Sequence, residues 1–266
     1  MRVILAMVRA TWRAASSYRV ATVFSLLGLA FTVVPLYFVT GALQGTMARS
    51  IEGEGGQYFA FVLAGIVATT MISEAISTVP SNVGGAATSG TLDALFLTPT
   101  PTIILFAGLS AYSVLWTTLR ATLLLVGGAA LGASIVWSSL PQACLVLLML
   151  MLAYVPFGLV MTAMQIAFRT TGPIMAGVMM ASTFLGGVYY PVRVIPSWIR
   201  DLSSLVPLTY GLRAFRKVLL EGVPMSAVLG DLGVLLVFIL GLGAIGVAAI
   251  AMAFRYARRT GGLSLY

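Results

Sequence analysis

The chain has 266 residues, of which 60% are hydrophobic and only 8% are charged, and its mean hydropathy is +1.05. Soluble domains carry roughly a quarter of charged residues, so this chain has too few polar side chains to cover a water-soluble fold. It has no His and a single Cys, Cys144, which excludes internal disulfides, His-based catalysis and a Cys/His zinc cluster. We therefore expect an all-α integral membrane protein without a metal site.

The net charge of +8 rests on arginines, with Lys217 the only lysine. In a soluble protein such a charge would suggest a nucleic-acid partner. Here the arginines flank apolar segments, which is the pattern that orients membrane proteins. We expect contact with membrane lipid and no nucleic-acid partner.

Residues 1–19 are predicted to form an amphipathic helix. Arg2, Arg9 and Arg13 share one face of a helical wheel, and apolar side chains lie opposite. This pattern is typical of a helix that lies on an anionic cytoplasmic membrane surface. A frayed basic tail that only sets the topology is the alternative.

Six apolar segments are predicted to cross the bilayer, which takes about 20 mostly apolar residues. They are residues 20–43, 57–79, 103–136, 143–168, 173–188 and 227–254. The first is too long for a signal-peptide core, so we expect it in the mature protein. The second is expected to end near Pro80. The third is long enough to be two short helices that meet at Arg120, which would give seven spans.

The arginines set the expected orientation. Arg2, Arg9 and Arg13 precede the first span, and Arg255 and Arg258 follow the last. Both termini are therefore expected in the cytoplasm, which requires an even number of spans. Six transmembrane helices satisfy this condition and argue against the split third span.

Two charged residues, Arg120 and Glu74, fall inside the predicted spans. A charge near mid-membrane costs about 3 kcal/mol on insertion scales and usually faces protein or water. Glu74, placed about one and a half turns from the cytoplasmic end of the second span, is the nearest candidate partner of Arg120. Packing, by snorkelling or ion pairing, and contact with a substrate are the roles considered for Arg120.

Enzymatic chemistry is not expected in this chain. Phosphate-binding loops need the pattern G-x-x-x-x-G-K-[ST], whereas Lys217 follows no glycine loop. Glu52 and Glu54 are interpreted as solvated charges of a flexible outer loop. An intramembrane enzyme that uses Asp93 or Glu74 is the remaining enzymatic alternative.

Residues 86–99 are predicted to form a short cytoplasmic helix. Thr91 is a candidate N-cap with Asp93 in the first turn, and Pro99 ends the helix. One helical face is then apolar, and it is exposed to the cytosol unless a partner covers it: Leu92, Leu95 and Phe96. Packing of this face on the chain's own bundle is the alternative.

Residues 189–223 mix aromatics, prolines and charges, which favours a re-entrant or interfacial segment over a span. Its motifs begin just before this range. They read Gly187-Val188-Tyr189-Tyr190-Pro191, Ile195-Pro196-Ser197-Trp198 and Pro207-Leu208-Thr209-Tyr210, followed by Arg213 and Arg216.

The two motif regions, about a fifth of the chain, resemble segments of type 2 ABC exporter permeases. That family includes bacterial exporters of drugs and polysaccharides. Residues 90–99 resemble its G-T-[LF]-[ED]-x-L-[LF]-x-T-P segment, and the second region resembles its segment before the last span. The family often has a charged E-R-E-like run before G-T. Here that run is Gly84-Gly85-Ala86-Ala87-Thr88-Ser89, so we expect a mostly apolar contact with the ATPase.

The resemblance implies a six-helix permease subunit, a homodimer, that docks two separate ABC ATPase subunits in the bacterial cytoplasmic (inner) membrane. ATP and Mg would be bound by the ATPase, and this chain would hold no cofactor. It implies that a coupling helix contacts the ATPase through Thr91, Leu92, Asp93, Leu95, Phe96 and Pro99. It also implies an outer re-entrant cap that contains Tyr189, Tyr190, Pro191, Pro196, Trp198, Pro207, Tyr210 and Arg213.

The expected function is ATP-driven export of a drug, a lipid or a lipid-linked glycan by alternating access. The sequence does not separate these substrates. A membrane anchor or assembly protein without transport is one alternative, and an ion-coupled secondary transporter is another. An ion-coupled transporter would be expected to have inverted repeats and acidic residues within its spans. The sequence shows no such repeats, and acidic residues within the spans are nearly absent.

Overall fold

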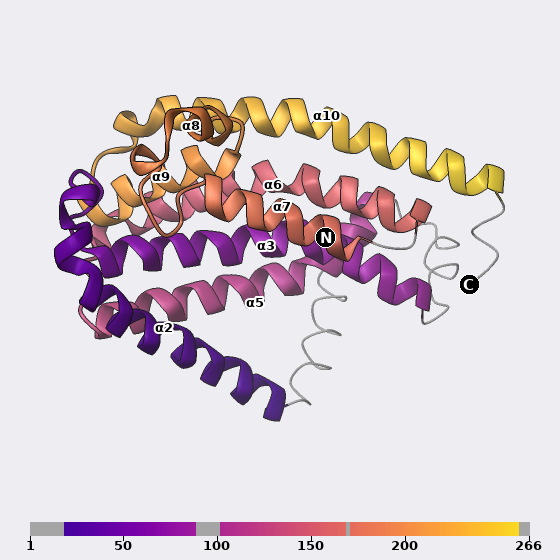
Figure 1. Cartoon of the computed structure of the whole chain (residues 1–266). Coiled ribbons are helices and arrows are strands. Elements are labelled where there is room, and N and C mark those ends of the chain that lie inside the picture. The colour runs from indigo at the N-terminus through magenta and orange to yellow at the C-terminus, as the bar shows by residue number, and fades with distance from the viewer. Residues whose placement is uncertain (1–18, 89–101, 169–170, 261–266) are drawn as a thin grey trace.

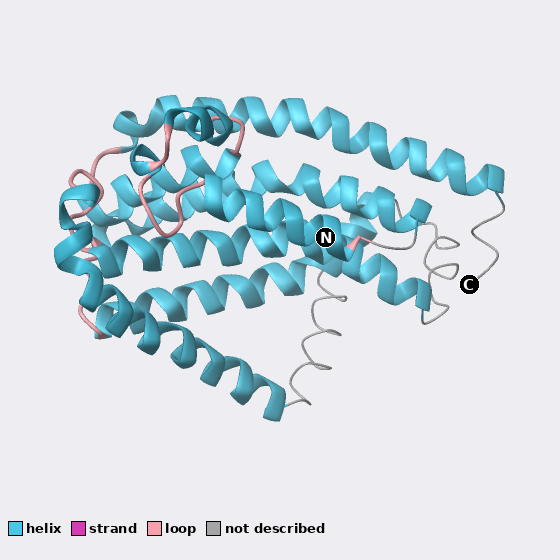
Figure 2. Ribbon diagram, viewed as in Figure 1, coloured by secondary structure: helices cyan, strands magenta, loops and turns pink. Residues whose placement is uncertain are grey.

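The computed structural model describes residues 19–88, 102–168 and 171–260, and these residues form helices and loops without a strand (Figures 1 and 2). Five described helices are long and apolar enough to cross a membrane. They are α2 (Arg19–Met47), α3 (Tyr58–Thr88), α5 (Thr102–Ala130), α6 (Leu140–Phe168) and α10 (Leu229–Thr260). The chain is therefore an all-helical, multi-pass membrane protein, as its composition predicts.

The fifth predicted span is a shorter helix, α7 (Gly172–Leu185). Its 14 residues extend about 21 Å at 1.5 Å per residue, whereas the hydrocarbon core is about 30 Å thick. The chain then continues through η3 (Val192–Val194), α8 (Ser197–Ser203), α9 (Pro207–Glu221) and η4 (Met225–Val228) into α10. The described residues thus give five long candidate spans and one short apolar helix, and the count of six spans stays a prediction.

The predicted end of the second span is wrong. α3 continues through Pro80 and reaches Thr88. A membrane helix tolerates an internal proline when neighbouring groups pack around the freed backbone, and Pro80 is buried. Glu74 therefore lies near the middle of α3, 14 residues before its last residue, rather than near its end.

The third span is one continuous helix through Arg120, so the alternative of two short helices is wrong. α5 ends at Ala130, six residues before the predicted end. Gly132 adopts a left-handed conformation with a φ of 95°, and the amide of Ala133 donates back to the carbonyl of Gly128. A glycine in this conformation commonly terminates a helix and reverses the chain.

α3 and α6 form the centre of the bundle. α6 packs mainly against α10 and α3, and α3 packs in turn against α5 and α2. Gly158 of α6 lies against the α3 backbone, since a Cβ atom there would come within 2.6 Å of the Ala75 carbonyl oxygen. In contrast, α2 and α10 lie at the outside of the bundle and expose large apolar side chains (Figure 1). Such faces suit contact with lipid or with another apolar surface.

Three connections meet at one end of the bundle, which we call the loop end: residues 48–57, 131–139 and 222–228 (Figure 1, left). Gln57 joins the first two, because its Nε2 donates to the Gly132 carbonyl over 2.9 Å and its Oε1 accepts from the Ser134 amide over 2.7 Å. The Val136 amide donates to the Leu219 carbonyl over 2.9 Å, which ties the α5–α6 connection to α9.

Candidate functional site

Residues 186–221, here called the cap segment, link α7 to the loop end. The side chain of Arg193 donates to the carbonyl oxygens of Ser50 and Glu52, each over 2.8 Å. The hydroxyl of Tyr58, at the start of α3, donates to the Tyr189 carbonyl over 2.9 Å. These bonds hold the first part of the cap segment at the loop end.

The cap segment then enters the bundle and returns. Leu208, the second residue of α9, packs against Gly186, where a Cβ atom would come within 2.8 Å of the Leu208 side chain. Gly211 packs against Leu150, which lies ten residues, or about 15 Å, inside α6. α9 runs back from there to Leu219, whose carbonyl is bonded at the loop end.

Arg216 is the buried anchor of this segment, with 3% of its surface exposed. Its Nη1 donates to Glu54 Oε2 over 3.2 Å, its Nε to the Phe61 carbonyl over 3.2 Å, and its Nη2 to the Val188 carbonyl over 2.9 Å. One side chain thus joins α9, α3, the loop before α3 and the start of the cap segment. Burial lowers the pKa of Arg216 to about 9 and Glu54 opposes this shift, so the guanidinium is charged at pH 7.

The interpretation of Glu54 as a solvated loop charge is wrong, since its carboxylate pairs with Arg216. The backbone explains how the loop brings it there. Gly53, Gly55 and Gly56, which flank Glu54, all have a positive φ, and a Cβ atom on Gly55 would collide with Leu220 of α9. These glycines let the loop lie directly on α9 with Glu54 turned toward it.

A second ion pair ties α9 to α10. Arg213 Nε lies 3.1 Å from Asp231 Oδ1 and 3.2 Å from Oδ2, and Nη2 also contacts Oδ1. The hydrogen bond to Asp231 is the main cause that raises the pKa of Arg213. The Arg213 guanidinium also lies over the Tyr210 ring, 5.4 Å from its centroid.

The aromatic and proline residues of the motifs differ in their roles in the cap segment: some form hydrogen bonds or are buried, and others lie at helix starts or are exposed. The Tyr190 hydroxyl donates to the Phe184 carbonyl over 3.0 Å, and Pro191 is buried. Pro196 precedes the first residue of α8, and Trp198 on that helix is 70% exposed. Most of the Trp198 surface is therefore not covered by the described residues.

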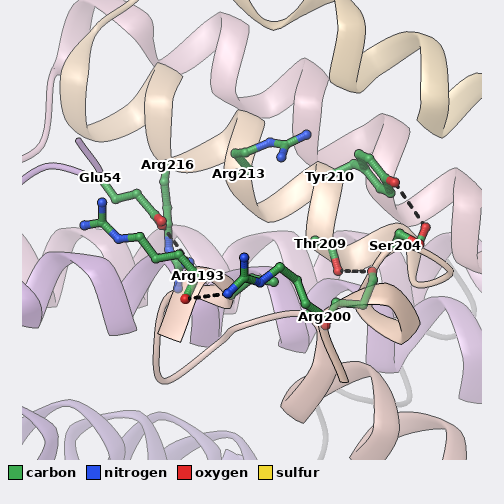
Figure 3. A pocket seen from close by; sticks show the side chains of 11 residues that line it. Glu54, Arg193, Arg200, Ser204, Thr209, Tyr210, Arg213 and Arg216 are labelled. Carbon is green, nitrogen blue, oxygen red and sulfur yellow. Dashed lines mark hydrogen bonds and ion pairs between the residues drawn. The ribbon is translucent and has the colours of Figure 1, made fainter. Parts of the chain in front are cut away.

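Two further motif residues begin α9. Pro207 occupies the first helical position, where its missing N–H costs no hydrogen bond, and it is buried. The Tyr210 hydroxyl donates to the Ser204 carbonyl over 3.1 Å, and the Thr209 hydroxyl donates to the Ser203 carbonyl over 2.7 Å. Side chains of α9 therefore fasten the end of α8 (Figure 3).

The candidate pairing of Arg120 with Glu74 is not formed among the described residues. The Glu74 carboxylate accepts hydrogen bonds from the hydroxyls of Thr78, on the same helix, and Thr117, on α5. Arg120 lies one turn beyond Thr117, and its Nε is buried without a partner in the described structure. The hydroxyls of Thr78 and Thr117 thus donate to Glu74 where the Arg120 guanidinium was the candidate partner.

Two predicted elements lie outside the described residues. One is the amphipathic helix over residues 1–19, of which only the last residue is described, as the start of α2. The other is the coupling helix, with Thr91, Leu92, Asp93, Leu95, Phe96 and Pro99.

Sequence reasoning missed the linkage of Glu54, Phe61 and Val188 through Arg216. Two features of the sequence marked parts of this linkage, although neither indicates which residues pair. Arg213 and Arg216 are three residues apart, which places them on neighbouring positions of one helix face. The glycine-rich loop around Glu54 also indicates a backbone shaped for close approach.

The helices and the cap segment define a multi-pass membrane protein with one end closed by a polar, hydrogen-bonded segment. The chain belongs to the ABC-2 type transporter family, whose sequence profile matches residues 2–220. It is 28% identical over 208 residues to inner membrane transport permease YadH of Escherichia coli strain K12, covering 77% of this chain and 78% of that protein. It is also 27% identical over 224 residues to nodulation protein J of Rhizobium leguminosarum bv. viciae, covering 84% and 85%.

Proposed function

We propose that this chain is the membrane-spanning subunit of an ATP-driven exporter and that a separate ABC ATPase supplies the energy. The family match carries this proposal, because it spans the α2–α7 bundle and nearly all of the cap segment. Lys217, the only lysine, lies inside helix α9 rather than in a glycine loop. Its position therefore favours ATP and Mg binding by the partner rather than by this chain.

We also propose the topology that the arginines predict. The loop end would face outward, and both termini would lie in the cytoplasm of a bacterium, with α7 completing six spans. The E. coli relative is named an inner membrane permease, which supports a cytoplasmic-membrane location. A homodimer is proposed because α2 and α10 expose apolar faces that a second copy and lipid would share.

In this proposal the cap segment is a re-entrant cap that closes the outer end of the translocation path. Arg216 and Arg213 hold it on α3 and α10, so movement of these helices would move the cap. ATP-driven closure of the ATPase pair would act through the coupling helix at Leu92, Leu95 and Phe96 and switch access between the two sides. The cargo would be a drug, a lipid or a lipid-linked glycan.

Affinity purification of the tagged chain from its native membrane tests the proposal. We expect an ABC ATPase to co-purify, the complex to hydrolyse ATP, and the chain purified alone to show only background turnover. ATP hydrolysis by the chain alone would contradict the proposal that a separate subunit hydrolyses ATP. A complex with no ATPase subunit would favour the anchor or assembly alternative.

A further inference from the structure

A cavity of about 350 Å³ lies between the cap segment and the loop before α3, and four arginines line it. Arg193 comes from η3, Arg200 from α8, and Arg213 and Arg216 from α9 (Figure 3). The volume falls within the range of about 300–1,000 Å³ typical of small-ligand sites. The loop before α3 adds Glu54 to the walls that η3, α8 and α9 provide, so the arginines approach the cavity from several directions and one carboxylate lies among them.

The charges around this cavity are not balanced. Glu54 neutralises Arg216, and Asp231 neutralises Arg213. Arg193 and Arg200 donate only to backbone carbonyls among the described residues, and no carboxylate of the described chain pairs with either. Two positive charges therefore remain for an anion to compensate.

Unused donors accompany this excess charge. Within the described chain Arg200 donates only through Nη2, to the carbonyls of Arg193 and Ile195, which leaves its Nε and Nη1 for a ligand. Ser203 also lines the cavity, is 1% exposed, and its Oγ has no hydrogen-bond partner in the described structure. Buried hydroxyls are normally hydrogen-bonded, so this orphaned group points to a missing partner in the cavity.

We propose that this cavity binds a phosphate-bearing anion. A tetrahedral phosphate offers several acceptor oxygens in different directions, which matches guanidinium groups and a hydroxyl that arrive from η3, α8 and α9. Arginine is also the side chain best suited to bidentate phosphate recognition. A planar carboxylate would satisfy fewer of these donors. The site deepens the proposed function and rests on it for its place on the outer face.

Such a phosphate could belong to a lipid headgroup or to a free anion. A second cavity of about 470 Å³, lined by mostly apolar side chains that include Leu185, Val194 and Ile199, is formed by the same stretch of chain. An acyl chain would suit those walls, whereas a free phosphate would leave them unused. The two sources therefore predict different affinities for phosphate with and without a lipid tail.

Isothermal titration calorimetry of the full chain in dodecyl maltoside, an uncharged detergent, tests the proposal. The probes are inorganic phosphate, dihexanoyl phosphatidylglycerol and dihexanoylglycerol, which has the same tails and no phosphate. We expect saturable binding of one or both phosphate probes, weakened by added salt, and no comparable binding of dihexanoylglycerol. Equal affinity of both phosphate probes would identify the free anion as sufficient, and tighter binding of the lipid would identify a headgroup.

Three variants locate the binding. Arg200→Gln should weaken it about tenfold, and Ser203→Ala should weaken it about threefold, as expected for a charge-assisted and a neutral hydrogen bond. Arg49→Gln removes an exposed arginine near the loop end that does not line the cavity, and it should bind within about twofold of the wild type. Ser203→Ala removes no hydrogen bond of the described structure, so it should fold normally even if Arg200→Gln does not.

Absence of binding by the wild-type chain would overturn the proposal. Equal binding by wild type, Arg200→Gln and Ser203→Ala would overturn it as well, because the anion would then sit elsewhere. The assay uses the chain without an ATPase, so its failure leaves the proposed transport function intact. Failure to recover an ATPase would likewise leave the anion site intact.

Discussion

The guanidinium of Arg216 lies over the ring of Phe61, with its central carbon 3.3 Å from the ring centroid, and its Nε donates to the carbonyl of the same residue. One residue of α3 thus offers both a π face and a backbone acceptor to α9. In a buried setting a cation–π contact is worth about 2 kcal/mol, in addition to the hydrogen bonds. Arg216 therefore joins the cap segment to α3 through two kinds of contact with one residue.

Replacement of Arg216 with Leu should therefore destabilise the protein. The change leaves Glu54 without its charge partner and leaves the carbonyls of Phe61 and Val188 without donors. Loss of one partner of a buried ion pair costs about 3–5 kcal/mol, and the partial exposure of Glu54 favours the lower end. Thermal unfolding in detergent, followed by tryptophan fluorescence, measures the effect.

The matched control is Arg49→Leu, which removes an exposed arginine near the same end of the bundle. Its melting temperature should stay close to that of the wild type. Combining Arg216→Leu with Glu54→Gln should recover part of the lost stability, because the second change removes the unpaired carboxylate. Additive losses in the double variant would show that the two side chains act independently.

Gly158→Ala should destabilise the centre of the bundle. The added Cβ would meet the Ala75 carbonyl at 2.6 Å, and backbone atoms cannot move aside as a flexible side chain can. Overpacking of this kind costs about 1–3 kcal/mol. Gly177→Ala in α7 is the control, since no atom beyond the nearby backbone of its own helix lies within 4 Å of the Cβ position and alanine favours helix. Equal melting temperatures of the two variants would show that α3 and α6 separate easily.

Hydropathy predicted the long helices correctly because burying about 20 apolar residues in lipid outweighs any local signal. The error at Pro80 has a related cause: packing in the bundle overrides the usual helix-breaking effect of proline, so α3 continues through it. The end of α5 depends on the conformation of Gly132, which hydropathy does not report. Boundaries that depend on backbone conformation or on packing were therefore less predictable than the spans.

In the candidate site too, the sequence identified individual residues but not the contacts between distant ones. The motif positions Tyr190, Pro207 and Tyr210 could be singled out because their types and order are distinctive. The pairing of Glu54 with Arg216 joins residues 162 positions apart, and a single sequence carries no signal for contacts at that separation. For the same reason nothing in the sequence indicated that Thr117 would satisfy Glu74 in place of Arg120.

Accessible cysteines should reveal the topology. In a Cys144→Ala background, cysteines introduced at the exposed positions Glu52 and Ser138 of the loop end should react with a membrane-impermeant maleimide in intact cells. A cysteine at Arg255, near the end of α10, should react only after permeabilisation. Labelling of Arg255→Cys from outside would reverse the proposed orientation, and labelling at both ends would contradict it.

The last prediction concerns Leu92, Leu95 and Phe96, which the sequence predicts on one face of the proposed coupling helix. Each buried side chain of this size contributes roughly 1.5–3 kcal/mol to a contact. Leu95→Ala combined with Phe96→Ala should therefore weaken ATPase docking or uncouple hydrolysis from transport. Co-purification of the ATPase, ATP turnover and export in vesicles measure these effects. Melting of the permease alone should stay unchanged, because the described core of the bundle lies in other helices.

Leu97→Ala is the matched control, since residue 97 falls about 200° around the helix from residue 95 and so on the opposite face. It should dock and transport normally. A double Ala variant that exports at the wild-type rate with full ATPase occupancy would show that this face transmits no force. Loss of permease stability in the double variant would instead show that Leu95 and Phe96 pack within their own bundle. In that case the ATPase contact would have to come from another cytoplasmic segment.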